Sequence, residues 1–220
     1  SLRQPMEKMA EDYKVINPNL TVNFNFGASG ALLQQLENGA PGDVFISAAT
    51  KQMDKAVEKG LVDEASRFDW LNNKLVVAVP IKSDLAIASI DDVEKADTIA
   101  IGAPDSVPVG SYAKEALTKA GKWEKVEPKA VMGKDVSQVL SFVESGSAQL
   151  GFVYSSDLIK REDKAKIAFE VPADLYSPIV YPAAILKSSQ LPEGAAEFVE
   201  FMKSEQAQTI LKDAGFTVIK

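Results

Sequence analysis

Three short segments combine small or hydroxyl residues with the pattern of a strand that runs into a helix. They are residues 27–30 (GASG), 106–110 (SVPVG) and 153–157 (VYSSD). Ligands gather at the carboxyl ends of strands in open α/β sheets, and a helix that begins there offers free N–H groups and about half a positive charge. None of the three segments contains a basic residue. The pattern predicts an anion site made of backbone N–H groups and hydroxyls, without a counter-charge.

Each of these segments also has a simpler interpretation. Ser29 could cap a helix and donate its hydroxyl to an anion, but a plain cap between two turn glycines explains residues 27–30 as well. Pro108 has no N–H and suits a helix start that leaves the N–H groups of Val109 and Gly110 free, although it also fits an ordinary helix start. Tyr181 lies in an apolar run, where it is either a core tyrosine or a donor into a cleft.

Composition removes several classes of function. The 220 residues include no histidine and no cysteine, so Ser-His-Asp and Cys-His catalysis and zinc sites built on these residues are excluded. Any enzyme would need Ser-Lys, tyrosine or carboxylate chemistry. The 24 basic and 31 acidic residues give a net charge of −7, which disfavours binding to a phosphate backbone. Neither GxxxxGK nor GxGxxG is present, so nucleotide binding is not indicated.

Helical and extended segments alternate along the chain, which predicts an α/β fold with mostly parallel strands. The apolar residues between Leu2 and Ile16 follow a helical spacing that ends at Asn17-Pro18, and residues 20–26 alternate as a strand. Further helices are expected at 31–38, 50–58 and 108–119, after Asp135, and twice near the C-terminus. Further strands are expected at 43–47, 75–80, 99–102, 150–154 and 179–186.

The chain is expected to form two lobes. The apolar runs at 75–80 and 179–186 are long enough for each to cross from one lobe to the other. The first lobe would then comprise residues 1–78 and 182–220, and the second lobe residues 79–181.

Five separated motifs resemble the molybdate-binding proteins of bacterial ABC importers, in order along essentially the whole chain. These motifs are residues 26–30 (FGASG), 38–48 (NGAPGDVFISA), 107–117 (VPVGSYAKEAL), 150–157 (LGFVYSSD) and 180–183 (VYPA), and residues 215–217 (GFT) also fit.

The resemblance implies a two-lobed, type II periplasmic-binding-protein fold, in which each lobe is a mostly parallel sheet flanked by helices and a tetrahedral oxyanion binds in the cleft between them. By position, the implied ligand contacts are Ser1, Ser29, Val109, Val153 and Tyr181. The serines would give hydroxyl and N–H donors, the valines backbone N–H donors, and the tyrosine its phenol. Members of the family have a short first strand before the Ser-Leu pair, so that strand is expected to be missing ahead of residue 1.

The implied function is high-affinity binding of molybdate or tungstate for delivery to the membrane permease of an ABC importer. The protein would be a non-catalytic monomer outside the cytoplasm, periplasmic or lipid-anchored, without a cofactor, a directly bound metal or a nucleic-acid partner. The alternatives are a solute-binding protein for sulfate, phosphonate or ferric ion, a ligand-sensing domain of the same fold, and a small α/β enzyme. Ferric ion would require carboxylate or tyrosinate ligands, which are not expected at the three strand-to-helix segments.

Overall fold

A computed structural model describes residues 1–159, 161 and 163–219, and they form two compact units. The terminal unit comprises Leu2–Asn72 and Val180–Lys220, and the middle unit comprises Ser1 and Asn73–Ile179. The sequence had suggested divisions at 78/79 and 181/182. Residues 75–80 instead lie wholly within the sheet of the middle unit, because all six belong to one strand of it.

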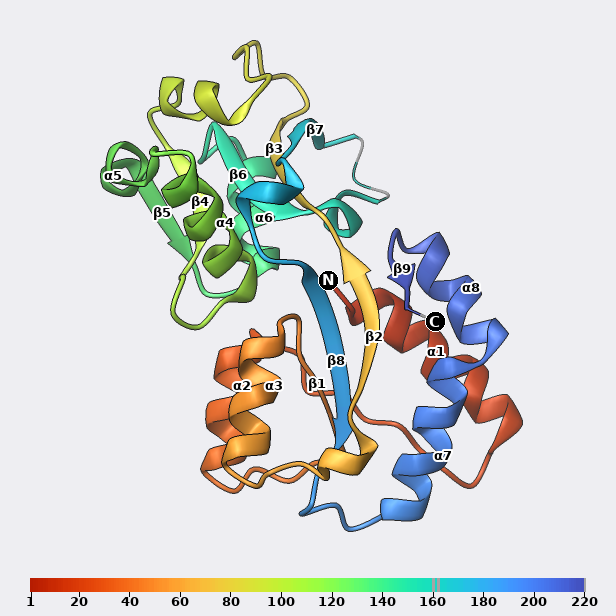
Figure 1. Cartoon of the computed structure of the whole chain (residues 1–220). Coiled ribbons are helices and arrows are strands. Elements are labelled where there is room, and N and C mark those ends of the chain that lie inside the picture. Colours follow the sequence, from red (N-terminus) through yellow and green to blue (C-terminus); the bar gives the residue numbers. More distant parts are fainter. Residues whose placement is uncertain (160, 162, 220) are drawn as a thin grey trace. The chain divides into compact units, whose positions relative to one another are not determined.

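The terminal unit has a four-stranded sheet in the order β1-β8-β2-β9. Figure 1 shows α2 and α3 on one side of this sheet and α1, α7 and α8 on the other. The elements are α1 (Arg3–Ile16), α2 (Ser29–Glu37), β1 (Val44–Ile46), α3 (Thr50–Glu58), η1 (Glu64–Ser66), β2 (Phe68–Asn73), β8 (Ile179–Ile185), α7 (Pro192–Lys203), α8 (Glu205–Asp213) and β9 (Thr217–Val218).

The predicted apolar face of α1 packs inward, which confirms the first expected helix. Met6, Met9 and Tyr13 are buried, and the Tyr13 ring lies 5.3 Å from Phe198 and 5.0 Å from Phe201 of α7, centroid to centroid. A second cluster, on the α2 and α3 side, contains Leu33, Phe45, Met53, Ala56, Val62, Ala184 and Leu186. Burial of these apolar side chains, more than helix propensity, holds the helices on the sheet.

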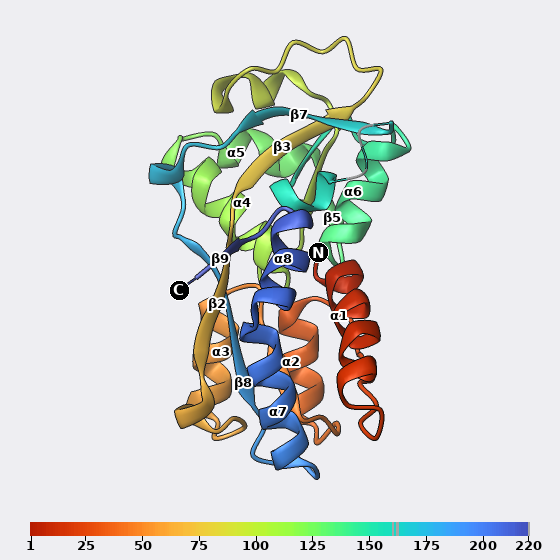
Figure 2. The same ribbon diagram turned by 90° about the vertical axis from the view of Figure 1, so that its right-hand side faces the viewer.

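The middle unit has a five-stranded sheet in the order β5-β4-β6-β3-β7. Helices α4 and α6 cover opposite sides of its strands (Figure 2). The elements are β3 (Leu75–Pro80), η2 (Ile90–Lys95), β4 (Ile99–Gly102), α4 (Pro108–Lys119), α5 (Trp123–Val126), η3 (Glu127–Lys129), β5 (Ala130–Gly133), α6 (Val136–Glu144), β6 (Leu150–Tyr154), η4 (Ser155–Leu158), β7 (Ala165–Glu170) and η5 (Ala173–Leu175).

The expectation of mostly parallel sheets is wrong. Strand β4 is parallel to β5 and β6, but β3 is antiparallel to both β6 and β7. In the terminal unit β1 pairs with β8, and β2 with β9, in antiparallel fashion. Parallel neighbours need a crossover connection, usually a helix, and α4 and α6 supply it for β4, β5 and β6 only. The α/β class itself is confirmed.

The strand expected at residues 20–26 is not formed. The alternation persists, because the apolar residues of this segment are half-buried and the polar residues between them are exposed. None of the described strands pairs with the segment. An alternating pattern of apolar and polar residues indicates only which side chains face the protein. A strand also requires a second strand to pair with its N–H and C=O groups.

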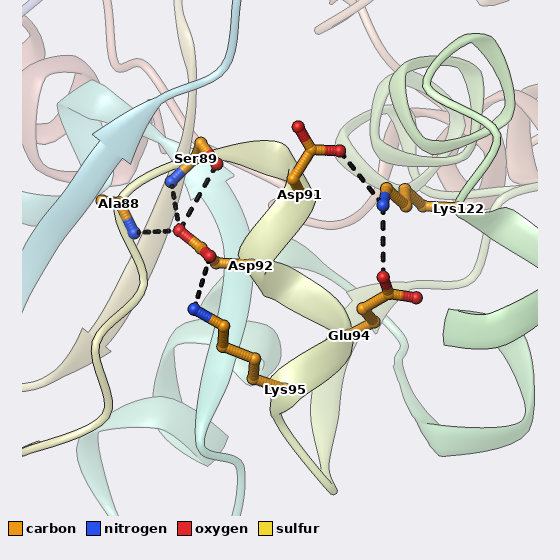
Figure 3. A network of polar contacts seen from close by, with 7 residues as sticks. All are labelled: Ala88, Ser89, Asp91, Asp92, Glu94, Lys95 and Lys122. Carbon is orange, nitrogen blue, oxygen red and sulfur yellow. Dashed lines mark hydrogen bonds and ion pairs between the residues drawn. The ribbon is translucent and has the colours of Figure 1, made fainter.

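The long connection between β3 and β4 is held by ion pairs around η2 (Figure 3). Lys122 Nζ lies 3.0 Å from Asp91 Oδ1 and 3.2 Å from Glu94 Oε1, and Lys95 Nζ lies 2.6 Å from Asp92 Oδ1. Asp92 Oδ2 also accepts hydrogen bonds from Ala88 N and Ser89 N. The bond from Lys95, together with the bond from Ala88, lowers the pKa of Asp92 from 3.8 to about 2. This acidic run therefore stabilises its own helix start.

No helix in the described part of the chain has the length and apolar character needed to cross a membrane.

Candidate functional site

Ser29 is the first residue of α2, in the terminal unit, and it is 5% exposed. It does not cap the helix as expected, because Ala28 occupies the N-cap position and no side chain caps α2. The Ser29 hydroxyl instead accepts a hydrogen bond from Ala48 N, at 2.9 Å. A hydroxyl has one proton to donate besides its lone pairs, so this contact leaves the proton of Ser29 available for another acceptor.

Val109 is the second residue of α4, in the middle unit, and it is buried. The helix begins with Pro108 as predicted, and its first main-chain bonds run from Gly110 N and Ser111 N to Val107 O. The N–H of Val109 comes before these bonds and is one of the amides that a helix start leaves open. Burial, with a smaller contribution from Glu115, raises the pKa of nearby Tyr112 well above its usual 10, so this phenol is neutral at physiological pH.

Val153 lies in β6, and the structure disagrees with its expected role as a backbone donor. Val153 is opposite Val76 in the antiparallel pair of β6 and β3, and the N–H of Ser155 donates to Lys74 O at 3.0 Å. N–H groups two residues apart leave a strand on the same side, so the N–H of Val153 faces β3. That group lies inside the sheet.

The start of α6 supplies a donor that the sequence analysis missed. The carboxyl ends of the parallel strands β4, β5 and β6 meet at one edge of the middle sheet, where α4 follows β4 and α6 follows β5. Val136 is the first residue of α6, and the Asp135 side chain caps the helix by accepting from Gln138 N at 2.8 Å. The N–H of Val136 is therefore an open amide at the same sheet edge as that of Val109. The signal in the sequence is the cap at Asp135, which marks a helix start directly after a strand although the two residues between β5 and α6 are neither glycine nor serine.

Ser1 and the end of β6 meet at Asp157. Asp157 Oδ2 accepts a hydrogen bond from Tyr154 N at 2.9 Å, and Asp157 Oδ1 lies 3.8 Å from the main-chain nitrogen of Ser1. Tyr154 is the last residue of β6 and is 2% exposed. The structure thus brings Ser1 beside Tyr154 at the carboxyl edge of the middle sheet.

Tyr181 lies in β8 of the terminal unit. It is 1% exposed, and its ring packs edge to face on Phe216 with centroids 5.5 Å apart. This position fits the core tyrosine that the sequence had left as the alternative.

The starts of α1, α2 and α4 share an electrostatic property that the capped start of α6 lacks. The N-cap residues of α1, α2 and α4 are Leu2, Ala28 and Val107, no side chain caps these helices, and no acidic residue lies in their first turns. Helix α3 has the same property, whereas Asp135 and Ser204 cap α6 and α8. Uncapped first-turn amides attract anions through the helix dipole. Among the described residues, no cluster of three or more acidic side chains could hold a metal ion.

Comparisons with known proteins agree with an anion-binding role. The chain is 36% identical over 224 residues to the molybdate-binding protein ModA of Haemophilus influenzae, covering 99% of this chain and 87% of that protein. It is 37% identical to ModA of Escherichia coli, covering 99% and 86%. The solved structure of the periplasmic molybdate-binding protein of Azotobacter vinelandii has a TM-score of 0.88 at 31% identity, covering all of this chain and 96% of that one.

A sequence profile described as "Bacterial extracellular solute-binding protein" matches residues 1–217. The two α/β units and the almost complete alignment with such proteins agree with this match. The chain belongs to the bacterial extracellular solute-binding protein family.

Proposed function

We propose that the protein binds molybdate or tungstate reversibly and delivers the anion to the permease of an ABC importer. The observation that carries this proposal is the alignment of 99% of the chain with relatives named molybdate-binding protein, at 36% and 37% identity. The fold alone does not identify the anion, since a sulfate-binding protein of Mycobacterium tuberculosis shares it with a TM-score of 0.84 at 15% identity.

The proposed ligand donors are the open amides and hydroxyls at the helix starts and strand ends. Ser1, Ser29 and Val109 keep the roles expected from the sequence. The N–H of Val136 replaces that of Val153, because the latter faces β3, and the hydroxyl of Tyr154 replaces that of Tyr181. These five positions would bind one tetrahedral anion.

The donors are sufficient for tight binding. The two serines would give a hydroxyl and an N–H each, and the other three positions one donor each. The resulting hydrogen bonds to a charged ligand, about seven in all and each contributing roughly 1.5–3 kcal/mol, can offset the dehydration of a dianion. Micromolar to nanomolar affinity corresponds to about −8 to −12 kcal/mol, which lies within that range. No arginine or lysine is needed at the proposed donor positions.

Selectivity follows from a site made of donors only. Hydrogen phosphate carries a proton that would face another donor, so one group would be left unpaired. Sulfate has no such proton at neutral pH, and it is excluded by size: donors set for the longer metal–oxygen bonds of molybdate are too far from the sulfate oxygens. Molybdate and tungstate are nearly the same size and should bind alike.

The remaining features of the proposal follow from a carrier role outside the cytoplasm. The protein would act without catalysis or a cofactor, as a monomer, in the periplasm or attached to a membrane by a lipid. Its macromolecular partner would be the permease, and nucleic acid is not a partner because the chain carries a net charge of −7.

Isothermal calorimetry with molybdate, tungstate, sulfate and phosphate at neutral pH tests the proposal. Tight binding of molybdate and tungstate alone is the expected result. Equal binding of sulfate would keep an oxyanion site but overturn the size argument. Binding of none of the four would overturn the proposed function.

A further inference from the structure

We infer that Ser47 is a positioning residue, which fixes the Ser29 hydroxyl as a hydrogen-bond donor to the ligand. This inference rests on the proposed function, since it concerns how one donor of that site is oriented. Ser47 lies between β1 and α3 of the terminal unit and is fully buried, at 0% exposure. Buried serines are uncommon unless their hydroxyl groups are satisfied.

The Ser47 side chain holds a tight turn. Its hydroxyl donates to Ala49 O at 2.6 Å and accepts from Ala49 N at 3.2 Å. The Ser47 N–H donates to Pro182 O at 3.0 Å, which joins the start of the turn to β8. Both polar groups of the Ala49 main chain are thus satisfied by one side chain, and the turn is tied to the sheet at its start.

The turn directs the next amide toward Ser29. Ala48 N donates to Ser29 Oγ at 2.9 Å, so Ser29, on α2, is held by a residue 19 positions later in the chain. A hydroxyl that accepts from an N–H has one lone pair occupied, and its proton is then directed at a different acceptor. Without a fixed Ala48 N–H, the Ser29 hydroxyl could rotate and present a lone pair to the anion instead.

This arrangement defines the chemical class of the ligand at Ser29. The ligand must present an acceptor oxygen there, because the serine offers a proton, and a negatively charged, unprotonated oxygen accepts the stronger hydrogen bond. A fully deprotonated dianion satisfies this condition at every oxygen, whereas a monoprotonated oxyanion does not. Ser47 contributes to selectivity although it need not contact the ligand.

A double-mutant cycle measured by calorimetry with molybdate tests the inference. Ser29→Ala and Ser47→Ala should each weaken binding, by about tenfold and about three- to tenfold respectively, as for loss of a hydrogen bond to a charged ligand. The double variant should bind like Ser29→Ala alone, because Ser47 acts through the Ser29 hydroxyl. A residue that only stabilised the fold would give losses that multiply.

Ser66→Ala is the matched control. The Ser66 hydroxyl donates to Asp63 O at 2.6 Å and accepts from Ile185 N at 2.8 Å, so it also ties a turn to β8, at the last residue of that strand. Its removal should lower the melting temperature and leave the molybdate affinity within about twofold of the parent.

Hydrogen exchange of the Ala48 amide gives a second measurement that does not depend on Ser47→Ala folding. The amide should be protected in the parent and exchange faster in Ser29→Ala, which lacks its acceptor. Three results would each overturn the inference and leave molybdate binding by the parent intact. They are equal exchange of the Ala48 amide in the two proteins, a parent-like affinity of Ser47→Ala, and losses of affinity that multiply in the double variant. A parent protein that binds none of the tested oxyanions would overturn the proposed function, and with it the role of Ser47 in binding.

Discussion

Gly110 of α4 lies directly against Gly102 at the end of β4. A Cβ atom on Gly110 would lie 1.8 Å from Gly102 O and 2.4 Å from its carbonyl carbon. This contact lets the first turn of α4, with the N–H of Val109, reach the carboxyl edge of the middle sheet. Two glycines without side chains therefore set the position of one proposed ligand donor.

Gly110→Ala should displace the start of α4 and weaken both folding and binding. We expect a loss of about 1–3 kcal/mol in the free energy of unfolding, because a methyl group is forced into a packed contact, and a loss of molybdate affinity of tenfold or more. Gly146→Ala is the control: Gly146 has φ +73° and nothing within 4 Å of an added Cβ, so only stability should fall. Urea denaturation and calorimetry measure the two quantities, and parent-like affinity of Gly110→Ala would contradict the argument.

Val136→Pro removes one proposed donor with little change to the backbone. Proline is tolerated at the first position of a helix, and Asp135, with φ −158° and ψ 170°, already has the extended conformation that a following proline requires. Loss of the N–H should cost about 1.5–3 kcal/mol of molybdate binding.

Two controls separate the N–H of Val136 from other effects of its replacement. Val136→Ala keeps the N–H and removes most of the side chain, so it should bind like the parent. Glu205→Pro places proline at the first position of α8, after Ser204, which is also in the extended region (φ −64°, ψ 158°), and should also bind normally. Equal calorimetric affinities for Val136→Pro and Val136→Ala would exclude this amide from the site.

A pair of tyrosine variants distinguishes the two candidate phenols. Tyr154→Phe should weaken molybdate binding by about 0.5–1.5 kcal/mol, because one neutral donor is lost while the backbone donors remain. Tyr181→Phe should leave affinity unchanged, since Tyr181 packs on Phe216 within the terminal unit. The reverse result in calorimetry would restore the assignment made from sequence.

The stability of the η2 segment should depend on pH at the acid end. The pKa of Asp92 is lowered from 3.8 to about 2 in the folded protein, so its carboxylate stabilises the fold above about pH 4. That contribution is lost progressively as the pH falls from 3.8 toward 2. An NMR titration of the Asp92 carboxyl carbon should give the low midpoint, and Lys95→Met should move it upward. A midpoint near 3.8 in the parent would contradict the network in Figure 3.

Gln52 offers a way to stabilise the protein. Its side chain is 4% exposed, and among the described residues its Oε1 has no hydrogen-bond donor. Gln52→Met should raise the free energy of unfolding by about 1 kcal/mol, because a buried polar atom without a partner is replaced by an apolar one of similar length. Gln149→Met should lower it, since Gln149 Oε1 accepts from Asp97 N. Urea denaturation of both variants checks the contrast.

Local signals predicted much of the helical structure. Pro108 begins α4, Lys119 ends it, and Gly121 follows in the left-handed conformation at φ +68°. Asp135 caps α6 as expected. These features depend on a few neighbouring residues, so they can be predicted from the local sequence.

The features that the sequence did not predict depend on which strands pair. The direction of the Val153 N–H depends on β3, which lies more than 70 residues earlier in the chain, and the same is true of the mixed orientation of the sheet. Residues 20–26 keep their alternation but pair with no described strand. Val136 was missed because an open backbone amide does not depend on the residue type that carries it.

The order of the strands in the terminal unit has a consequence for how the protein acquires its fold. Strand β8 lies between β1 and β2, although more than 100 residues separate it from either along the chain. The strands of the middle unit are all contained in residues 73–179, so a chain emerging from the ribosome can assemble that sheet first. The terminal sheet can join β1 to β2 only after β8 has been synthesised, which makes its closure a late step with a large loop-closure entropy.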